Sequence, residues 1–298
     1  MKNVLFIVIS ILCFSLFAQN NKDVEKLKKI IYTFADDSMQ GRAAGSDGEQ
    51  KAKNYLVSYF KTIGLQPIND SFIQEFTFSK DTANIDTAYN IIGYIDYKAD
   101  STIIIGAHYD HIGLGGPKSR SLTDKKIHPG ADDNASGVAA LLLISDYLKT
   151  KASGNSNYCI VFFSAHEEGL FGSNDFVNKK YIDLLNIKLV INLDMVGRLD
   201  TSAKNLVIRG EETNLVFDSI FKTLPHPQFH VIRRALSQGD HTPFVNQGIP
   251  CLSFTTGVHD DYHKPSDTPD KINYTGLSAI VQFVEQMIVL YTEKNNTD

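Results

Sequence analysis

The most constraining feature of this sequence is an apolar run that ends close to two adjacent acids. Residues Tyr158–Phe163 are apolar or aromatic throughout, which is typical of a strand buried on both faces of a sheet. Glu167 and Glu168 follow within a few residues. Two neighbouring carboxylates at the end of a buried strand repel each other and lose hydration, so the pair is costly unless a cation or a proton-transfer role lies beside it. For the dipeptide alone, a solvent-exposed turn is the simpler interpretation. The rest of the chain must decide between such a turn and a functional site.

From residue 102 onward, apolar strand-like segments alternate with segments of helical periodicity. Four buried strands are predicted, at Thr102–Ala107, Tyr158–Phe163, Lys188–Leu193 and Ile249–Phe254. A helix whose apolar residues begin at Val138 separates the first two strands, and a closing helix is predicted over Ser278–Tyr291. The alternation predicts the α/β class, as a three-layer α/β/α sandwich with a mixed, mostly parallel central sheet.

The first hundred residues are predicted to belong to the same domain. Their apolar spacing indicates helices over Asp23–Ala35 and from Ser46 or Asp47 to Gly64, and strands over Phe72–Phe78 and Tyr89–Tyr97. The polar stretch 79–88 between the two strands is too short to hold an inserted domain. A length of 298 residues would also allow two domains, but the periodicity favours one, from residue 19 to residue 298.

Residues 1–18 resemble a secretory signal peptide. Lys2 is their only charged residue, and an apolar run over residues 4–17 precedes Ala18. A run this short with a basic start is more typical of a cleaved signal than of a spanning helix. We therefore expect cleavage after Ala18, export to the periplasm or the cell exterior, and no membrane span in the remaining chain.

The net charge and the cysteines indicate which binding partners are excluded and whether the thiols are free. Loss of Lys2 with the signal changes the formal net charge from −5 to −6, which argues against nucleic acid, because a phosphate backbone calls for a concentrated basic face. Cys159 and Cys251 remain, both in apolar runs. This placement favours two buried free thiols, and a disulfide is the alternative open to an exported protein. The sequence gives no indication of oligomeric state.

Residues with metal-binding side chains follow the predicted strands or begin a predicted helix. They are His108, Asp133, Glu167, Glu168, Asp194 and His263. In open α/β sheets, ligands bind outside the carboxyl ends of the strands. Imidazoles and carboxylates without thiolates favour a catalytic zinc site. The set exceeds the needs of one tetrahedral ion, which predicts two ions that share a bridging carboxylate.

Each of these residues also has a structural interpretation. A histidine at a strand end often serves as a hydrogen-bonding group, Asp133 is placed to cap a helix, and Asp194 is placed to cap a turn. Their occurrence together along one edge of one sheet favours the metal site. The other histidines, His111, His128, His166, His226 and His230, are predicted not to bind metal.

Several of these residues lie in motifs that occur together in one known family. The motifs are Gly41-Arg42, Gly45-Ser46, Ala107–His111, Gly130–Gly137, His166–Leu170, Asn192–Met195 and Asp261–Thr268. In this combination, nearly the whole mature chain resembles the co-catalytic zinc aminopeptidases of the bacterial leucyl aminopeptidase type. That family also contains carboxypeptidases and glutaminyl cyclases. The run Ser237–Phe244 departs from the family pattern by extra residues before Asp240.

The resemblance implies how two zinc ions are held. His108 and Asp194 hold one ion, Glu168 and His263 hold the other, and Asp133 bridges the two. It also implies that the zinc pair activates a water molecule for attack on a peptide carbonyl.

The resemblance further implies three roles in catalysis. Glu167 is the general base, which takes a proton from the attacking water and passes it to the leaving amine. Asp110 orients His108, and Tyr262 donates a hydrogen bond to the substrate carbonyl oxygen. The implied function is hydrolysis of N-terminal residues from peptides with a free N-terminus.

Three other functions remain open for a chain of this kind. A glutaminyl cyclase with one zinc ion shares the fold. A carboxypeptidase would need a cationic pocket for the terminal carboxylate, for which Arg198, Arg233 and Arg234 are the candidates. A binding module without catalytic activity would lack the metal.

Overall fold

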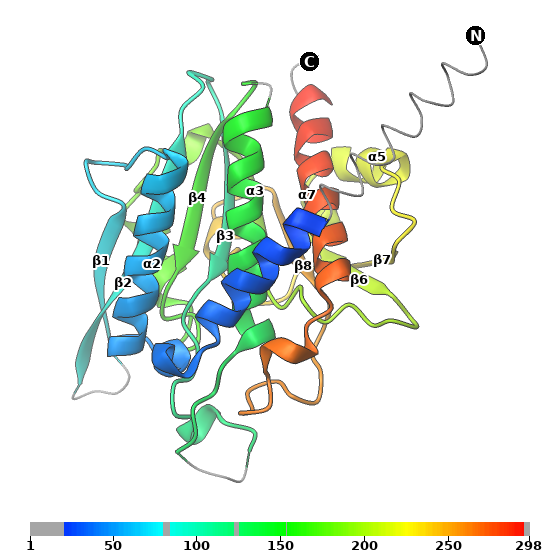
Figure 1. Cartoon of the computed structure of the whole chain (residues 1–298). Coiled ribbons are helices and arrows are strands. Elements are labelled where there is room, and N and C mark those ends of the chain that lie inside the picture. Colours follow the sequence, from blue (N-terminus) through cyan, green and yellow to red (C-terminus); the bar gives the residue numbers. More distant parts are fainter. Residues whose placement is uncertain (1–20, 80–83, 122–124, 153, 295–298) are drawn as a thin grey trace.

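The fold is known from a computed structural model, which describes residues 21–79, 84–121, 125–152 and 154–294. The predicted signal peptide, residues 1–18, lies outside the described residues. The described chain forms one eight-stranded sheet with helices on both faces (Figure 1). This architecture confirms the predicted α/β sandwich.

The sheet is mixed, with a parallel centre. Its strands are β1 (Ile73–Ser79), β2 (Ile85–Ile95), β3 (Thr102–His108), β4 (Asn157–Phe163), β5 (Ile187–Leu193), β6 (Asn205–Arg209), β7 (His230–Arg234) and β8 (Cys251–Thr255), in the order β1-β2-β4-β3-β5-β8-β6-β7. The neighbours β4, β3, β5 and β8 run parallel, whereas β1, β2 and β6 join their neighbours toward the centre in antiparallel fashion. The carboxyl ends of the four central strands therefore meet at one edge.

Helices cover both faces of the sheet. One face carries residues 21–34, α2 (Asp47–Ile63), α3 (Gly137–Lys151), α5 (Val216–Thr223) and α7 (Tyr274–Lys294), most of which cross the front of Figure 1. The other face carries α4 (Phe171–Asn178) and α6 (Thr242–Val245). Short helical turns are η1 (Asp37–Arg42), η2 (Gly116–Lys118), η3 (Ala131–Ser136), η4 (Leu184–Asn186), η5 (Glu211–Thr213) and η6 (Pro269–Lys271).

Alternate residues of the central strands fill two separate cores. In β3, Ile103 and Ile105 join the core beneath α2, α3 and α7, whereas Ile104 joins the core that contains Phe176 of α4 and Phe244 of α6. Side chains of a strand point to opposite faces in turn, so a strand covered on both sides must be apolar at every position. This requirement explains the unbroken apolar runs of the sequence.

Most predicted elements are confirmed within a few residues, but two strands were missed. Helix α2 begins after Ser46, whose hydroxyl accepts from the Glu49 amide, and ends at Gly64, which has a φ of 73°. Strand β2 begins at Ile85, four residues before the predicted start. Strands β6 and β7 are five residues each and only partly buried, so their sequences lack the long apolar run that marked the central strands.

Two expectations about the remaining chain concern membranes and thiols. In the part of the chain that the structure describes, no helix combines the length and apolar character that a bilayer span requires. Cys159 in β4 and Cys251 in β8 are buried and free, which confirms the predicted thiols and excludes the disulfide. Burial raises the pKa of both thiols above its usual value, so neither is a reactive thiolate.

Candidate metal centre

Residues predicted at the strand ends meet at the carboxyl edge of the sheet. His108 is the last residue of β3, Asp133 lies in η3, and Asp194 directly follows β5. Glu167 comes from the turn after β4, and His263 from the loop after β8. Because the four strands are parallel, segments far apart in sequence deliver these side chains to one place.

Asp133 lies at the middle of this group, with its two oxygens facing different histidines. Its Oδ1 is 3.3 Å from Nε2 of His108, and its Oδ2 is 3.1 Å from Nε2 of His263. Asp194 lies on the first side, with Oδ1 3.5 Å from His108 Nε2. Glu167 lies on the second side, with Oε1 3.2 Å from His263 Nε2. One carboxylate therefore stands between two sets of nitrogen and oxygen ligands.

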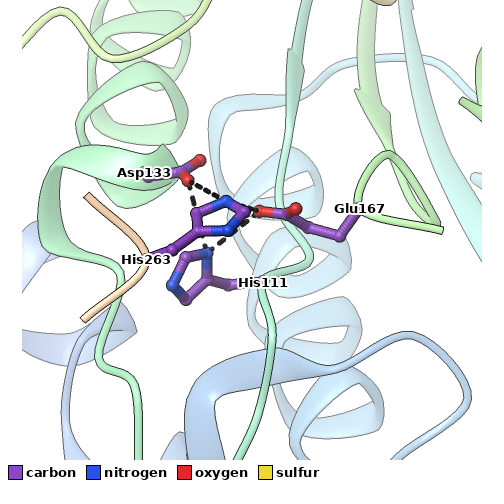
Figure 2. Close-up of side chains that lie close together, drawn as sticks. All are labelled: His111, Asp133, Glu167 and His263. Carbon is purple, nitrogen blue, oxygen red and sulfur yellow. Dashed lines mark hydrogen bonds and ion pairs between the residues drawn. The ribbon is translucent and has the colours of Figure 1, made fainter. Parts of the chain in front are cut away.

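Two sets of side chains in the described chain have the spacing of a metal site. The first is His111, Asp133, Glu167 and His263, whose side chains point toward one another from different segments of the chain (Figure 2). The second is His108, His166 and Asp194. In each set the ligand atoms lie within 4.8 Å of one another.

The η3 turn fixes the orientation of Asp133, because the residues beside Asp133 form hydrogen bonds with the segment after β5. The Asn134 amide donates to the Leu193 carbonyl, and its Oδ1 accepts from the Met195 amide. Asp132 and Ser136 accept from the main chain of Gly197 and Val196. A Cβ at Gly137 would lie 2.5 Å from the Leu193 carbonyl oxygen, so only glycine permits this close approach. The residues around Asp133 in the Gly130–Gly137 motif thus fasten the Asp133 carboxylate to the sheet edge.

Arg42 holds two of these segments together from inside the protein. Its side chain is fully buried, and it donates to the carbonyl oxygens of Phe34, Tyr109, Pro129 and Gly130. Burial lowers the pKa of Arg42 to about 10 despite the opposing charges of Asp133 and Asp110. The guanidinium therefore stays charged at neutral pH and fixes the chain beside His108 and before Asp133.

Asp110 was predicted to orient His108, and in the structure it contacts both His108 and the turn after β4. Its carboxylate lies 3.7 Å from Nδ1 of His108, while the hydrogen bond of that nitrogen is with the Asp110 carbonyl, at 3.1 Å. The same carboxylate accepts from the amides of His166 and Glu167, each at 3.1 Å. Asp110 thus joins the end of β3 to the turn that carries the acidic pair.

Glu168 and Tyr262 lie at the rim of the centre. The Glu168 carboxylate is 2.6 Å from Nζ of Lys118 and belongs to neither metal-site set. Lys118 also accepts a hydrogen bond from His263 through its carbonyl oxygen, so Glu168 lies beside the loop that supports His263. The Tyr262 ring packs on His263, with ring centroids 3.9 Å apart, and the Arg120 guanidinium lies 4.6 Å from its centre. The separate roles predicted for Glu167 and Glu168 stay predictions.

The electrostatics of the centre favour bound positive charge. Burial opposes protonation of His108, but the nearby Asp110, Asp133 and Asp194 carboxylates outweigh it and raise the pKa of His108 well above its usual value. Burial likewise opposes protonation of His263, yet Asp133 and Glu167 raise its pKa to about 10. Such shifts mark a strongly negative potential at the imidazole nitrogens, which a cation offsets as well as a proton does.

Unpartnered atoms show that the residues present fit a metal ion. Nε2 of His108, Nε2 of His263 and Oδ2 of Asp133 are buried and lack a hydrogen-bond partner among the described residues. Buried polar atoms normally have partners. Ligand atoms of a tetrahedral zinc ion lie about 3.3 Å apart when each is about 2.0–2.1 Å from the metal, which matches the spacing of these atoms around Asp133.

Sequence reasoning missed two histidines of the centre. His111 lies with Nδ1 3.2 Å from Glu167 Oε1 and 3.6 Å from Asp133 Oδ2, and His166 belongs to the set with His108 and Asp194. Both had been predicted to lie outside the ligand set. Their positions in the chain were the available signal, because each is adjacent to a site residue, Asp110 or Glu167.

Proteins with similar sequences include aminopeptidases. Aminopeptidase YwaD of Bacillus subtilis is 29% identical over 202 residues, which cover 63% of this chain and 41% of that protein. A probable leucine aminopeptidase of Arthroderma otae is 35% identical over 156 residues, which cover 50% of this chain and 38% of that protein. The chain thus spans about two fifths of the length of these curated relatives.

Solved structures share the fold over almost their whole length. A Zn-dependent exopeptidase from Parabacteroides distasonis has a TM-score of 0.76 at 20% identity, over 89% of this chain and 97% of that one. The glutaminyl cyclase of Porphyromonas gingivalis has a TM-score of 0.70 at 21% identity, over 88% and 97%. Residues 90–288 match the model of peptidase family M28, which confirms the resemblance inferred from the motifs. Since that match covers more than half of the chain and includes every residue of the centre, this protein belongs to peptidase family M28.

Proposed function

We propose that the protein is an exported zinc aminopeptidase with two metal ions, which hydrolyses N-terminal residues from peptides. The observation that carries the proposal is the placement of Asp133, whose two oxygens face His108 on one side and His263 on the other. A single ion would need only one of these faces. Export rests on the signal-like residues 1–18.

Residues on the two sides of Asp133 would hold the ions. His108 and Asp194 would hold the first, and His263 with Glu168 the second. When bound, a zinc pair supplies the Lewis acidity that polarises a peptide carbonyl and lowers the pKa of water towards about 7.

The protein's own groups supply proton transfer and orientation. Glu167 is 8% exposed in its side chain and lies among Asp133, His111 and His263, so it reaches the centre of the site. Burial and the Asp133 charge favour its neutral form, but contacts with His111 and His263 prevail and lower the pKa of Glu167 to about 2. It is therefore ionised at neutral pH, which is the form that a general base requires. Tyr262, whose ring packs on His263, would donate to the substrate carbonyl oxygen.

The carboxylates also support a preference for a free amino terminus. Asp133, Asp194, Glu167 and Glu168 offer carboxylate oxygens around the metal positions, which can accept hydrogen bonds from the α-ammonium group of a peptide. Of the three arginines considered for a carboxypeptidase pocket, Arg233 and Arg234 lie on β7, whereas Arg198 forms an ion pair through Nη2 and its Nη1 has no hydrogen-bond partner among the described residues. Arg233 pairs with Glu211 and Asp218 at the far edge of the sheet, and Arg198 pairs with Asp261.

The two neighbouring glutamates provide a matched test of the centre. Glu167→Gln is expected to keep about two zinc ions per chain and to lower kcat by about 10²–10⁴-fold, as loss of a general base does. Glu168→Gln is expected to bind about one zinc ion fewer. Elemental analysis and turnover of aminoacyl amides measure both properties. The reverse pattern would exchange the two roles, and normal metal content with normal turnover in both variants would reject both assignments.

A substrate panel tests the reaction itself. We expect the wild type to release residues from peptides with a free N-terminus and not from their N-acetylated forms, in a reaction that chelation abolishes. Cyclisation of N-terminal glutamine without amide hydrolysis would identify a glutaminyl cyclase. Release from the C-terminus would identify a carboxypeptidase, and a protein without zinc or turnover would be a binding module.

A further inference from the structure

His111 is a buried histidine of the centre that the proposed ligand set does not use. Its Nδ1 is 3.2 Å from Oε1 of Glu167, which is within hydrogen-bond distance (Figure 2). The same nitrogen is 3.6 Å from Oδ2 of Asp133, which is too long for a hydrogen bond. The hydrogen-bond partner of the imidazole is therefore Glu167 rather than Asp133.

The surroundings of the His111 ring determine which of its nitrogens carries the proton. Nε2 is buried and has no hydrogen-bond partner among the described residues. With the proton on Nε2 alone, that proton would lack an acceptor, and the Nδ1 lone pair would face the Glu167 carboxylate. A proton on Nδ1 avoids both costs, because it is donated to Oε1 of Glu167. A nitrogen that donates in this way has no lone pair left for a metal ion.

The chain around His111 leaves the ring little freedom to turn. Its amide donates to the Arg42 carbonyl at 3.2 Å. The ring lies against Gly130, where an added Cβ would be 2.6 Å from Cδ2 of His111, and Arg42 donates to the Gly130 carbonyl at 3.0 Å. The ring of His263 meets that of His111 edge-on, with centroids 5.5 Å apart. His111 therefore presents Nδ1 in a fixed direction.

Glu167 is held through both its main chain and its carboxylate. Its amide donates to the Asp110 carboxylate at 3.1 Å. Among the described residues, its own carboxylate pairs with His111 and His263. In the proposed centre Nε2 of His263 binds a metal ion, so this nitrogen cannot also hold Glu167. His111 is then the side chain that keeps the carboxylate in place.

We propose that His111 is a positioning residue of the reaction, which holds the Glu167 carboxylate by a hydrogen bond from Nδ1. The inference rests on the proposed function, because it takes Glu167 as the general base. One oxygen of Glu167 accepts from His111, which leaves the other free to accept the proton of the attacking water. A general base must keep an oxygen within hydrogen-bond reach of that proton. Loss of His111 should therefore lower kcat, by misplacing Glu167, and leave KM nearly unchanged.

Three substitutions of His111 in the purified mature protein test this role by turnover of an aminoacyl amide and by zinc content. His111→Leu removes the donor and is expected to lower kcat by about 10²-fold, with zinc content as in the wild type. His111→Asn retains an amide donor close to the position of Nδ1 and should recover most of this loss. His111→Gln carries its amide one bond further out and should recover less. The comparison of His111→Asn with His111→Gln carries the test should His111→Leu not fold.

A double variant distinguishes positioning from a general disturbance of the structure. If His111 acts through Glu167, its loss has no further effect once the base is gone. Glu167→Gln combined with His111→Leu should therefore have the kcat of Glu167→Gln alone, whereas independent effects would multiply. His226→Asn is the control, because the His226 ring contacts Phe229 and Phe283 rather than the centre. It should keep the kcat and the zinc content of the wild type.

The outcomes separate this inference from the proposed function. A wild type that neither binds zinc nor hydrolyses the amide would overturn both. An active wild type whose His111→Leu variant lacks one zinc ion would identify His111 as a ligand and overturn the inference alone. Equal losses of kcat in His111→Asn and His111→Leu, or losses that multiply in the double variant, would also overturn it. Recovery in His111→Asn and non-multiplying losses, at unchanged zinc content, would support it.

Discussion

Two buried carboxylates lie near the end of β3, and their surroundings differ in one decisive respect. Glu49 accepts hydrogen bonds from the amides of Gly45 and Tyr89 and from the hydroxyls of Tyr109 and Ser164, at 2.5–3.2 Å. Asp133, by contrast, has an oxygen that faces imidazole nitrogens without a hydrogen-bond partner among the described residues. The hydrogen bonds of Glu49 all come from within the protein, whereas an oxygen of Asp133 is left available to a bound cation.

This difference separates a structural acid from a ligand acid, although sequence position does not. A buried charge costs several kcal/mol unless hydrogen bonds or counter-charges compensate it. Around Glu49 the donors are fixed main-chain and hydroxyl groups, so the carboxylate helps to hold α2 against the sheet. Around Asp133 the compensation comes from the His108 and His263 imidazoles when they are protonated, and a bound metal ion could take the place of those protons. The following predictions test this contrast.

The largest expected effect is on catalysis when Asp133 is changed. Asp133→Asn should lower kcat/KM by about 10³-fold or more, because both metal positions lose their shared carboxylate. In chelator the variant should unfold at a somewhat lower temperature than metal-free wild type, because the ionised Asp133 carboxylate is then paired with the protonated His108 and His263 imidazoles. Steady-state kinetics and thermal unfolding in chelator measure the two quantities. A large loss of stability without chelator-dependent change would place Asp133 with the structural acids.

Metal removal should have the next largest effect, on stability. A ligand present at about 1,000 times its Kd stabilises the folded state by about 4 kcal/mol, so chelation should lower Tm by several degrees. Glu49→Gln should show a similar chelation shift, because its network does not include the metal ligands. Asp133→Asn should show almost none. An equal chelation shift in the Asp133 variant would contradict the assignment of the bridging residue.

Substitution of Glu49 should affect stability far more than catalysis. Glu49→Ala leaves buried amide and hydroxyl donors without an acceptor, which we expect to cost about 3 kcal/mol, measured by urea unfolding. Glu49→Gln keeps an acceptor oxygen and should lose less. We expect kcat of the folded variants to change by less than about tenfold. Loss of zinc from a fully folded Glu49 variant would contradict the purely structural role of Glu49.

The smallest effect concerns a third acid, Glu285 on α7, which lies apart from both networks. Burial, and secondarily the charge of Asp23, raises the pKa of Glu285 to about 8. The folded state thus binds this proton more tightly than the unfolded state does, so the free energy of unfolding should fall as pH rises from about 4.5 to about 8. Because Glu285 is only partly buried, we expect this fall in the free energy of unfolding to be about 2 kcal/mol at most.

Denaturant unfolding at several pH values measures this dependence. Glu285→Gln should flatten the decline between pH 5 and pH 8 relative to wild type. Glu75→Gln, at an exposed position of β1, is the matched control and should leave the profile unchanged. An unaltered profile in Glu285→Gln would show that the side chain is hydrated in solution.

The central fold and much of the centre could be predicted because they depend on local pattern. Buried parallel strands are apolar at most positions, so β3, β4, β5 and β8 were recognisable as largely apolar runs. Chemistry-bearing residues that follow such runs or precede the next helix share this edge, which brought together His108, Asp133, Asp194 and His263. Strands β6 and β7 carry no such pattern, since they are short and only partly covered.

Other features of the centre could not be predicted, because they depend on how side chains turn after the chain has folded. Glu167 and Glu168 are neighbours with the same chemistry, yet one reaches His263 and the other reaches Lys118. His111 and His166 both belong to the motifs, but the local sequence does not show whether a histidine side chain points into the centre or away from it.

The sequence by itself determined the fold class, the edge of the sheet at which the centre forms, and the types of side chain that meet there. These follow from hydrophobic periodicity and from the parallel direction of the central strands. Only the tertiary structure decided that Asp133 faces two imidazole sets at once, that Arg42 clamps the surrounding chain, and that Asp240 reaches His166 across 74 positions of sequence. Contacts of this kind depend on distances between segments that no local pattern encodes.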